Sequence, residues 1–357
     1  MTETICMRRE TAGRETAGRD IAVSDEFVRE TAPFRRELLA HCYRMLGSVH
    51  DAEDLVQETM LRAWRSYPDF DPGRASMRTW LHRIATNACL NALESRSRRP
   101  LPSDLSGPGG LADAPRHPEG RDVEIPWLQP FPDTLLGAGG DAGGMDAGGA
   151  ADPAAVVAAR DSIRLAFVAA LQHLPARQRA VLILRDVLAW RAAEVADLLE
   201  ITTAAVNSAL QRARAQLQEV APDRDRVPRP ADQRQRELAD RYVAAFVDAD
   251  VDTLTRLLAD EVVLEMPPFL IWFRGRETVS AFLAGRALVS PGRWRAIPVW
   301  ANGQPAMGAY LRGDDGRHHA HSVQVFDVTD ASLTRITAFQ DLRLFGTFGL
   351  PLVYPAG

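Results

Sequence analysis

The stretch DAEDLVQETMLRAW (Asp51–Trp64) decides how this chain folds, together with RTWLHRIATNACLNALESRSRRP (Arg78–Pro100). Carboxylates crowd the start of the first stretch, where they favour the positive end of a helix dipole. Its apolar residues recur at helical spacing, and four of them predict a core stripe: Leu55, Met60, Leu61 and Trp64. The opposite face is polar and suited to binding another protein, with Asp54, Gln57, Glu58 and Arg62.

The second stretch predicts a helix over 77–95 whose polar face suits nucleic acid. Arg83, Asn87 and Asn91 follow one another at four-residue steps on that face. Beyond it, three arginines have no acid between them: Arg96, Arg98 and Arg99. Such a cluster is typical of phosphate contacts, although a solvated tail would look the same. A unit that holds a protein on one face and DNA on the other indicates an adaptor.

Length and composition bound the class of protein. The 357 residues suffice for two or three domains, and 46% hydrophobic residues are ordinary for a globular chain. No apolar run reaches the roughly 18 residues of a membrane helix, so we expect no membrane segment. Residues 1–24 are polar and repetitive, which predicts a disordered tail rather than a signal peptide. The three cysteines are widely spaced, which argues against a disulfide framework, and we expect a cytoplasmic protein.

The charge balance limits how the chain meets DNA. The net charge is −5, whereas a free-standing DNA binder is usually basic. DNA contact is therefore local, or a partner supplies more basic surface. All 42 Lys and Arg positions are Arg, which suits bidentate contacts to phosphate and guanine but also fits a GC-rich coding bias.

A Pro- and Gly-rich segment separates the N-terminal helices from the next ones. Residues 103–155 predict a flexible linker, and its Gly run lacks the preceding strand that a nucleotide site needs. The apolar island IPWLQPFPD (Ile125–Asp133) is out of place in a linker. We expect it to dock on another part of the chain, with Trp127 and Leu128 making an inter-domain contact.

Helical periodicity returns over 156–222 and contains a helix-turn-helix pattern. The helix AAEVADLL is followed by a turn at Glu200–Thr202 and by a second helix, for which Thr202 is the expected N-cap. The second helix carries polar side chains that we expect to be exposed: Asn207, Gln211, Arg212 and Arg214.

The last part of the chain changes character after a second linker at 223–233. A long helix precedes five strand-like runs: Val262–Pro268, Trp294–Gly303, Ala306–Gly316, His318–Ser332 and Leu333–Phe345. Helices followed by a curved antiparallel sheet predict an α+β cone with an apolar pocket over 234–350.

Two clusters in this cone invite functional interpretations. His318, His319 and His321 suggest a metal, but only His319 and His321 share a strand face, so we expect no metal site. Six residues are candidates to line the pocket: Tyr242, Met266, Trp272, Tyr310, Phe339 and Asp341. Catalysis, ligand sensing and a structural or regulatory contact all stay open. No acid–base pair is placed for catalysis, so we expect neither an enzyme nor a cofactor.

Three segments resemble an extracytoplasmic-function sigma factor of bacterial RNA polymerase: FRRELLAHCYRMLGSVHDAEDLVQETMLRAW, RTWLHRIATNACLNAL and LPARQRAVLILRDVLAWRAAEVADLLEITTAAVNSALQRAR. The region from 234 is similar to SnoaL-like domains, on GRETVSAFL and NGQPAMGAY. The resemblance implies a multidomain fold: two all-α sigma domains (25–102 and 156–222, the second with a helix-turn-helix) and an α+β SnoaL-like cone domain. In sigma factors with such an extension a tryptophan-bearing linker motif is common, and Trp127-Leu128-Gln129-Pro130 resembles it.

The resemblance implies transcription initiation with core RNA polymerase and promoter DNA as partners. The core-binding face would comprise Asp51, Asp54, Gln57, Glu58 and Arg62. The minus-ten element would be melted and read by Arg78, Arg83, Asn87, Asn91, Arg96, Arg98 and Arg99. The minus-thirty-five element would be read by Thr203, Asn207, Ser208, Gln211, Arg212 and Arg214. The C-terminal domain would regulate activity, and an anti-sigma factor or a small ligand is left open as its partner.

The promoter sequence cannot be carried over, because Asn207, Ala209 and Leu90 stand where relatives often have basic residues. Two other functions stay open at this point. The chain could be a one-component transcription factor that binds DNA through 158–218 alone, although the acidic helix argues against it. It could also be an isomerase or cyclase fused to a DNA-binding domain.

Overall fold

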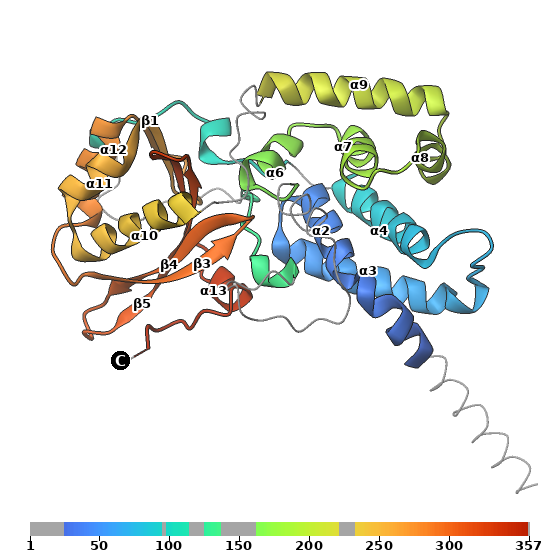
Figure 1. Cartoon of the computed structure of the whole chain (residues 1–357), viewed down its shortest axis with the longest axis horizontal. Helices are drawn as coiled ribbons and strands as arrows, with labels where there is room; N and C mark the ends of the chain where they lie inside the picture. The colour runs from blue at the N-terminus through green and yellow to red at the C-terminus, as the bar shows by residue number, and fades with distance from the viewer. Residues whose placement is uncertain (1–24, 95–97, 114–124, 137–161, 221–232, 356–357) are drawn as a thin grey trace, which may run out of the picture. The chain divides into compact units, whose positions relative to one another are not determined.

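The computed structural model describes residues 25–94, 98–113, 125–136, 162–220 and 233–355. The chain divides into two compact units. The first comprises Met1–Cys42 and His50–Ser95, and the second comprises Tyr43–Val49 and Arg96–Gly357. Figure 1 shows that the described part of the first unit is helical and that the sheet belongs to the second. In the described ranges, no helix is long and apolar enough to cross a membrane.

Three helices carry the first stretches of sequence: α2 (Arg35–Leu46), α3 (Val49–Ser66) and α4 (Met77–Glu94). The short 3-10 turn η1 (Ala32–Phe34) precedes α2, and a second one, η2 (Tyr67–Asp69), lies between α3 and α4. Helix α2 ends because Gly47 takes a left-handed conformation, with φ of +69°, that few other residues adopt without strain.

The buried side of α3 differs from the predicted core stripe. The residues that face the core are mostly small and fall on one side of the helix: Ala52, Leu55, Val56, Thr59 and Ala63. Leu61 and Trp64 are instead 56% and 48% exposed, so their assignment to the core was wrong. Ala63 occupies the helix side nearest the core, and each residue turns the helix by about 100°, which places Leu61 on the far side.

The helical part of the second unit contains the predicted helix-turn-helix. It is built from α6 (Leu165–Leu171), α7 (Ala176–Leu182), the π-helical turn η6 (Ile183–Val187), α8 (Ala192–Leu199) and α9 (Thr203–Val220). Helix α8 ends at Glu200, whose φ of 55° turns the chain. The Thr202 hydroxyl then accepts a hydrogen bond from the Ala205 amide at 3.1 Å, which confirms the expected N-cap.

The cone is a six-stranded sheet covered on one face by helices (Figure 1). The strands are β1 (Leu258–Glu265), β2 (Trp272–Arg274), β3 (Trp294–Ala301), β4 (Gln304–Arg312), β5 (His318–Val328) and β6 (Leu333–Phe339). Their order is β2-β1-β6-β5-β4-β3, and only β1 and β6 are parallel. Helices α10 (Gln233–Asp248), α11 (Val251–Leu257) and α12 (Arg276–Phe282) cover that face, whereas α13 (Arg343–Thr347) packs on the other, where Phe345 contacts Tyr310. This architecture confirms the predicted fold class.

Aromatic side chains form much of the cone's core. Tyr242 and Phe246 of α10 pack with Phe326 of β5 and Trp294 of β3, with ring centroids 5.1 to 6.2 Å apart. The opposite face of the sheet meets the C-terminal residues, because a Cβ on Gly308 would meet Leu350 at 2.5 Å. The range predicted for the last strand, Leu333–Phe345, was too long, since β6 ends at Phe339 and α13 follows. The short β2 was missed, because three residues carry no readable alternation.

Candidate functional site

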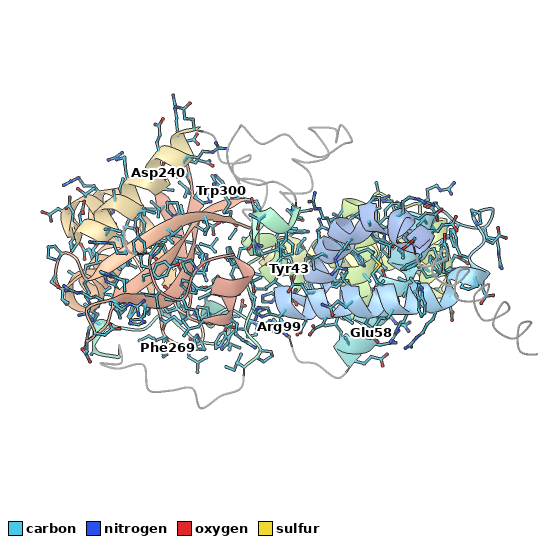
Figure 2. The ribbon with its side chains drawn as sticks, turned by 90° about the horizontal axis from the view of Figure 1, so that it is seen from below. Tyr43, Glu58, Arg99, Asp240, Phe269 and Trp300 are labelled. Carbon is cyan, nitrogen blue, oxygen red and sulfur yellow. The ribbon has the colours of Figure 1, made fainter. Side chains whose placement is uncertain are left out.

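The outer face of α3 is polar and open to solvent. Asp54 and Gln57 are exposed, and Glu58, labelled in Figure 2, accepts a 2.5 Å hydrogen bond from Arg62 one turn later. Asp51 is half-buried in the first turn of the helix. Leu61 and Trp64 are exposed beside these polar side chains. An exposed Leu and Trp among charges are typical of a surface that another protein covers, and sequence periodicity missed them.

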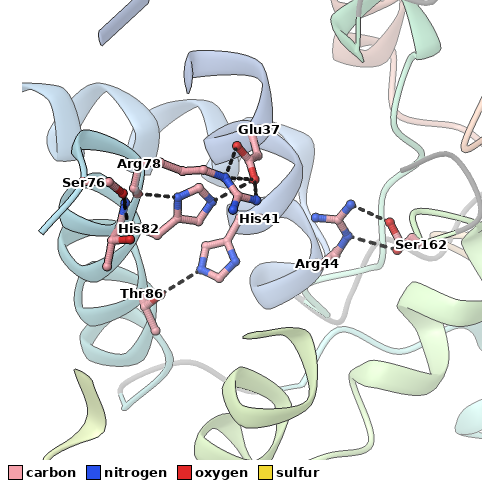
Figure 3. Close-up of polar contacts among 9 residues, drawn as sticks. Glu37, His41, Arg44, Ser76, Arg78, His82, Thr86 and Ser162 are labelled. Atoms are coloured by element: carbon pink, nitrogen blue, oxygen red, sulfur yellow. Dashed lines mark hydrogen bonds and ion pairs between the residues drawn. The ribbon is translucent and has the colours of Figure 1, made fainter. Parts of the chain in front are cut away.

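Arg78 is committed to an ion pair inside the first unit. Its Nε lies 2.9 Å from both carboxylate oxygens of Glu37, and its NH2 group also contacts Glu37 (Figure 3). The hydrogen bond to Glu37 is the main reason why the pKa of Arg78 is raised. The buried ring of His82 lies 3.7 Å from the same carboxylate. Arg78 therefore joins α4 to α2, so this residue has a structural role that needs no contact with DNA.

The amide face of α4 is exposed as the spacing indicates. Arg83, Asn87 and Asn91 are all exposed, while the helix buries residues on its other side. Near the start of α4, the rings of Phe70 and Trp80 lie 4.8 Å apart, and Tyr67 stacks on Phe70 at 6.5 Å. These half-buried rings were missed, although the aromatic residues of the Tyr67–Ser76 turn were a readable signal. Aromatic platforms of this kind accept unpaired bases.

The arginines that follow α4 are held by other residues of the second unit. Arg98 donates to Nδ1 of His173 at 2.9 Å, and His173 Nε2 contacts Asp104 at 3.1 Å. Burial alone would raise the pKa of Asp104, but the hydrogen bonds from His173 and from the Leu101 amide lower it overall. Arg99 donates to the Trp127 carbonyl at 3.2 Å. Arg96 lies outside the described residues.

Helix α9 presents a polar face with small residues between the polar ones. Its exposed side chains include Thr203, Asn207, Ser208, Gln211 and Arg212. Such an exposed second helix of a helix-turn-helix fits the DNA major groove. Arg214 is also exposed, but it makes a bidentate ion pair with Asp186 at 2.7 and 3.0 Å.

The apolar island of the linker is buried. Leu128 is fully buried, and its amide donates to the Pro100 carbonyl at 3.2 Å. The Gln129 side chain accepts a 2.8 Å hydrogen bond from Ser48. Trp127 is half-buried and contributes its carbonyl to Arg99.

The six residues predicted to line one pocket of the cone do not share a site. Tyr242 lies in the core, where burial raises the pKa of its hydroxyl. Trp272 donates to the Ser106 carbonyl at 2.9 Å, and Tyr310 packs against Phe345 on the other face of the sheet. Asp341 pairs with Arg343 at 2.7 Å, so the common pocket was a wrong expectation. Met266 is half-buried and Phe339 is buried.

The three histidines of β5 have separate surroundings. His319 pairs with Asp315 at 2.9 Å, and His318 contacts the Gly292 carbonyl at 3.0 Å. The His321 ring packs edge-on against Trp294 at 5.0 Å. Among the described residues, no three His, Cys, Asp or Glu side chains are grouped so that they could hold a metal ion.

Comparison with known proteins places these elements in families. The model of sigma-70 region 2 matches residues 32–99, that of sigma-70 region 4 matches 164–217, and that of the SnoaL-like domain matches 239–336. The chain is 49% identical over 331 residues to the ECF RNA polymerase sigma factor SigG of Mycobacterium tuberculosis, covering 91% of this chain and 84% of SigG. The chain belongs to the extracytoplasmic-function sigma factor family.

Two further comparisons extend to the SnoaL-like domain. This sigma factor is 29% identical over 301 residues to SigJ of Mycobacterium tuberculosis, covering 81% of this chain and 82% of SigJ. The match to the crystal structure of SigJ covers 91% of this chain and 99% of the SigJ chain, with a TM-score of 0.59 and 25% identity. Sigma factors bind core RNA polymerase and promoter DNA to start transcription. The chain is therefore a transcription initiation factor rather than an enzyme, and the two alternative functions give way to this one.

Proposed function

We propose that the outer face of α3 is the surface of this sigma factor that binds core polymerase. Asp51, Asp54, Gln57, Glu58 and Arg62 supply charge and hydrogen bonds, and Leu61 with Trp64 supplies apolar area. The observation that carries this assignment is an exposed Leu61 within a charged helix face. Apolar anchors ringed by polar residues are where interface binding energy concentrates.

For promoter DNA, the proposed minus-ten reader is the amide face of α4, with Arg83, Asn87 and Asn91. Amide side chains read the edges of extruded bases, and the Phe70–Trp80 pair offers a surface on which a base can stack. Arg78, Arg98 and Arg99 were predicted to contribute as well. To contact phosphates, each of them would exchange its partner in this structure, which is Glu37, His173 or the Trp127 carbonyl.

The proposed minus-thirty-five reader is α9, through Thr203, Asn207, Ser208, Gln211 and Arg212, with Arg214 at its edge. These side chains are exposed, and the Thr202 cap fixes the start of the helix. The SnoaL-like domain is proposed to regulate activity, and an anti-sigma factor or a small ligand would act there. The site of action is the cytoplasm, where core polymerase works.

In vitro transcription tests the whole proposal. Full-length protein and a truncation to residues 1–233 are each added to sigma-free core polymerase on a genomic promoter library. Promoter-specific transcripts from either protein support the assignment, and the ratio between them gives the sign of the C-terminal domain's effect. If neither protein directs transcripts while the full chain alone retards DNA, the proposal fails. Equal output from both would refute regulation by the C-terminal domain.

A further inference from the structure

The turn between β3 and β4 is buried, which is unusual for a hairpin turn. Asn302 and Gly303 have φ of 57° and 68°, the left-handed pair that a two-residue Asn-Gly turn requires. Such turns normally point their polar groups to water. Here Asn302 is fully buried, and Gln304 beside it is 1% exposed. The Gln304 side-chain nitrogen donates to the Phe326 carbonyl of β5 at 3.2 Å, but the partners of Asn302 and of the Gln304 side-chain oxygen come from segments far away in sequence.

The first partner is the linker. The Phe131 backbone amide donates to the side-chain oxygen Oδ1 of Asn302. The Asn302 backbone amide donates in turn to the Phe131 carbonyl, and both distances are 2.8 Å. Pro132 forms an antiparallel bridge with Ala301, and Asp133 Oδ1 accepts from the Gly303 amide at 2.8 Å. The Phe131 ring is fully buried. Main-chain pairing with a buried anchor beside it is how extended peptides are recognised at sheet edges.

The second partner is the segment that leads into α6. Asn302 Nδ2 donates to the Ile163 carbonyl at 2.5 Å and to the Tyr43 hydroxyl at 2.8 Å. Gln304 Oε1 accepts from the Leu165 amide at 3.0 Å, at the first residue of α6. Arg44 holds the preceding Ser162 by hydrogen bonds of 2.6 and 3.1 Å (Figure 3). One amide side chain therefore holds both the linker and the approach to α6.

We propose that the Asn302–Gly303 turn is a latch that recognises Phe131-Pro132-Asp133 and, while closed, fixes the start of α6. This proposal rests on the proposed function, because it names the contact through which the SnoaL-like domain regulates. Helix α6 begins the domain that carries the helix-turn-helix. An open latch would free both the linker and the lead-in to that domain, since Asn302 bonds to both.

Asn302→Asp is the sharpest test of the latch. The substitution keeps the size of the side chain and its tolerance of positive φ, but it replaces the donor to Ile163 and Tyr43 with a carboxylate oxygen. Gln324→Glu is the control, because it makes the same amide-to-acid change at a buried position of the same sheet that bonds to Ser322. Amide hydrogen exchange of full-length protein, followed by mass spectrometry, reports the opening.

We expect roughly tenfold faster exchange of the Phe131 and Leu165 amides in Asn302→Asp than in Gln324→Glu, with β5 equally protected in both. Equal exchange of those two amides in the variants and the wild type would overturn the latch. If the cone loosens as a whole, the β5 amides also exchange faster. Faster exchange of β5 in both variants would therefore refute a specific latch as well.

Recognition is tested with a synthetic peptide of residues 125–136. In a full-length Phe131→Ala, Asp133→Ala protein, the cis segment keeps its main-chain contacts but loses the buried ring and the carboxylate, so a peptide that carries both should displace it and fluorescence anisotropy should detect the binding. Wild-type protein, whose site is occupied, should bind it at least about tenfold more weakly. Adding Asn302→Asp should abolish binding. If the doubly substituted protein binds no peptide, recognition of this sequence is refuted.

Transcription assays keep this proposal distinct from the proposed function. If Asn302→Asp raises exchange and shifts promoter output towards that of the 1–233 truncation, the latch is the regulatory contact. Raised exchange with wild-type output overturns its regulatory role, while the sigma assignment stands. If no form of the protein directs transcription, the proposed function fails, and the exchange and peptide measurements still decide whether the latch exists.

Discussion

Leu61 and Glu58 lie one turn apart on the solvent side of α3, although one is apolar and the other charged. We expect Leu61→Asp to weaken binding to core polymerase by at least about tenfold, because it removes an apolar anchor from the proposed interface. The thermal midpoint should not change, since the side chain is 56% exposed. Leu352→Asp is the matched control, at 60% exposure in the C-terminal residues. Equal affinities of the two variants would contradict this assignment.

The Arg214–Asp186 ion pair should limit the affinity of this protein for DNA. Asp186→Ala releases a guanidinium on the DNA-reading domain, so we expect tighter and more salt-dependent binding to duplex DNA. The slope of log K against log salt should steepen by about one for one added phosphate contact. Arg214→Ala should not steepen it. Titrations at several salt concentrations check this, and identical slopes would show that Arg214 does not reach DNA.

Asn87 and Asn91 should act on melted rather than duplex DNA. We expect the double substitution to Ala to reduce transcription from an intact promoter by tenfold or more, about the cost of losing one or two base contacts. Binding to a minus-thirty-five duplex should be unchanged, and so should thermal stability, because both side chains are exposed. Asn207→Ala serves as the reciprocal control. A loss of duplex binding in the Asn87, Asn91 variant would argue against the assignment.

Arg78 should contribute to the stability of the folded protein independently of any contact with DNA. We expect Arg78→Met to lower the free energy of unfolding by about 1 kcal/mol, because Glu37 loses a bidentate partner that water only partly replaces. Arg83→Met, at an exposed position of the same helix, should change it by less than about 0.5 kcal/mol. Urea unfolding of both variants makes the comparison. A larger loss in Arg83→Met would overturn the structural role of Arg78.

His321 gives the cone a pH-dependent stability. Burial, with a smaller contribution from Arg293, lowers the pKa of His321 to about 4. The unfolded chain takes up this proton near its ordinary pKa of about 6.5, so the free energy of unfolding falls as the pH drops from about 6.5 to 4. The loss should be at most about 3 kcal/mol and absent above neutrality. His321→Gln should flatten this dependence, and a pH profile of the variant that runs parallel to that of the wild type would refute the prediction.

Periodicity predicted the helices and the major strands because burial repeats along each of them. It missed β2 and α13, which are short, and it misassigned Leu61, because small residues such as Ala52 and Ala63 take the core side of α3. Nor could it show that Arg78 and Arg214 have acidic partners, because Glu37 and Asp186 lie 41 and 28 positions away in the chain.

The sequence by itself determined the helix-turn-helix with its Thr202 cap and the amide steps of α4, because these depend on neighbours within one or two turns. It also determined that an apolar island in the linker must be covered. Only the tertiary structure decided what covers it, since Phe131 meets Asn302 across 171 positions of the chain. Local spacing fixes which face a side chain takes on its own helix or strand. Its partner is fixed by how distant segments pack, and no local pattern records that.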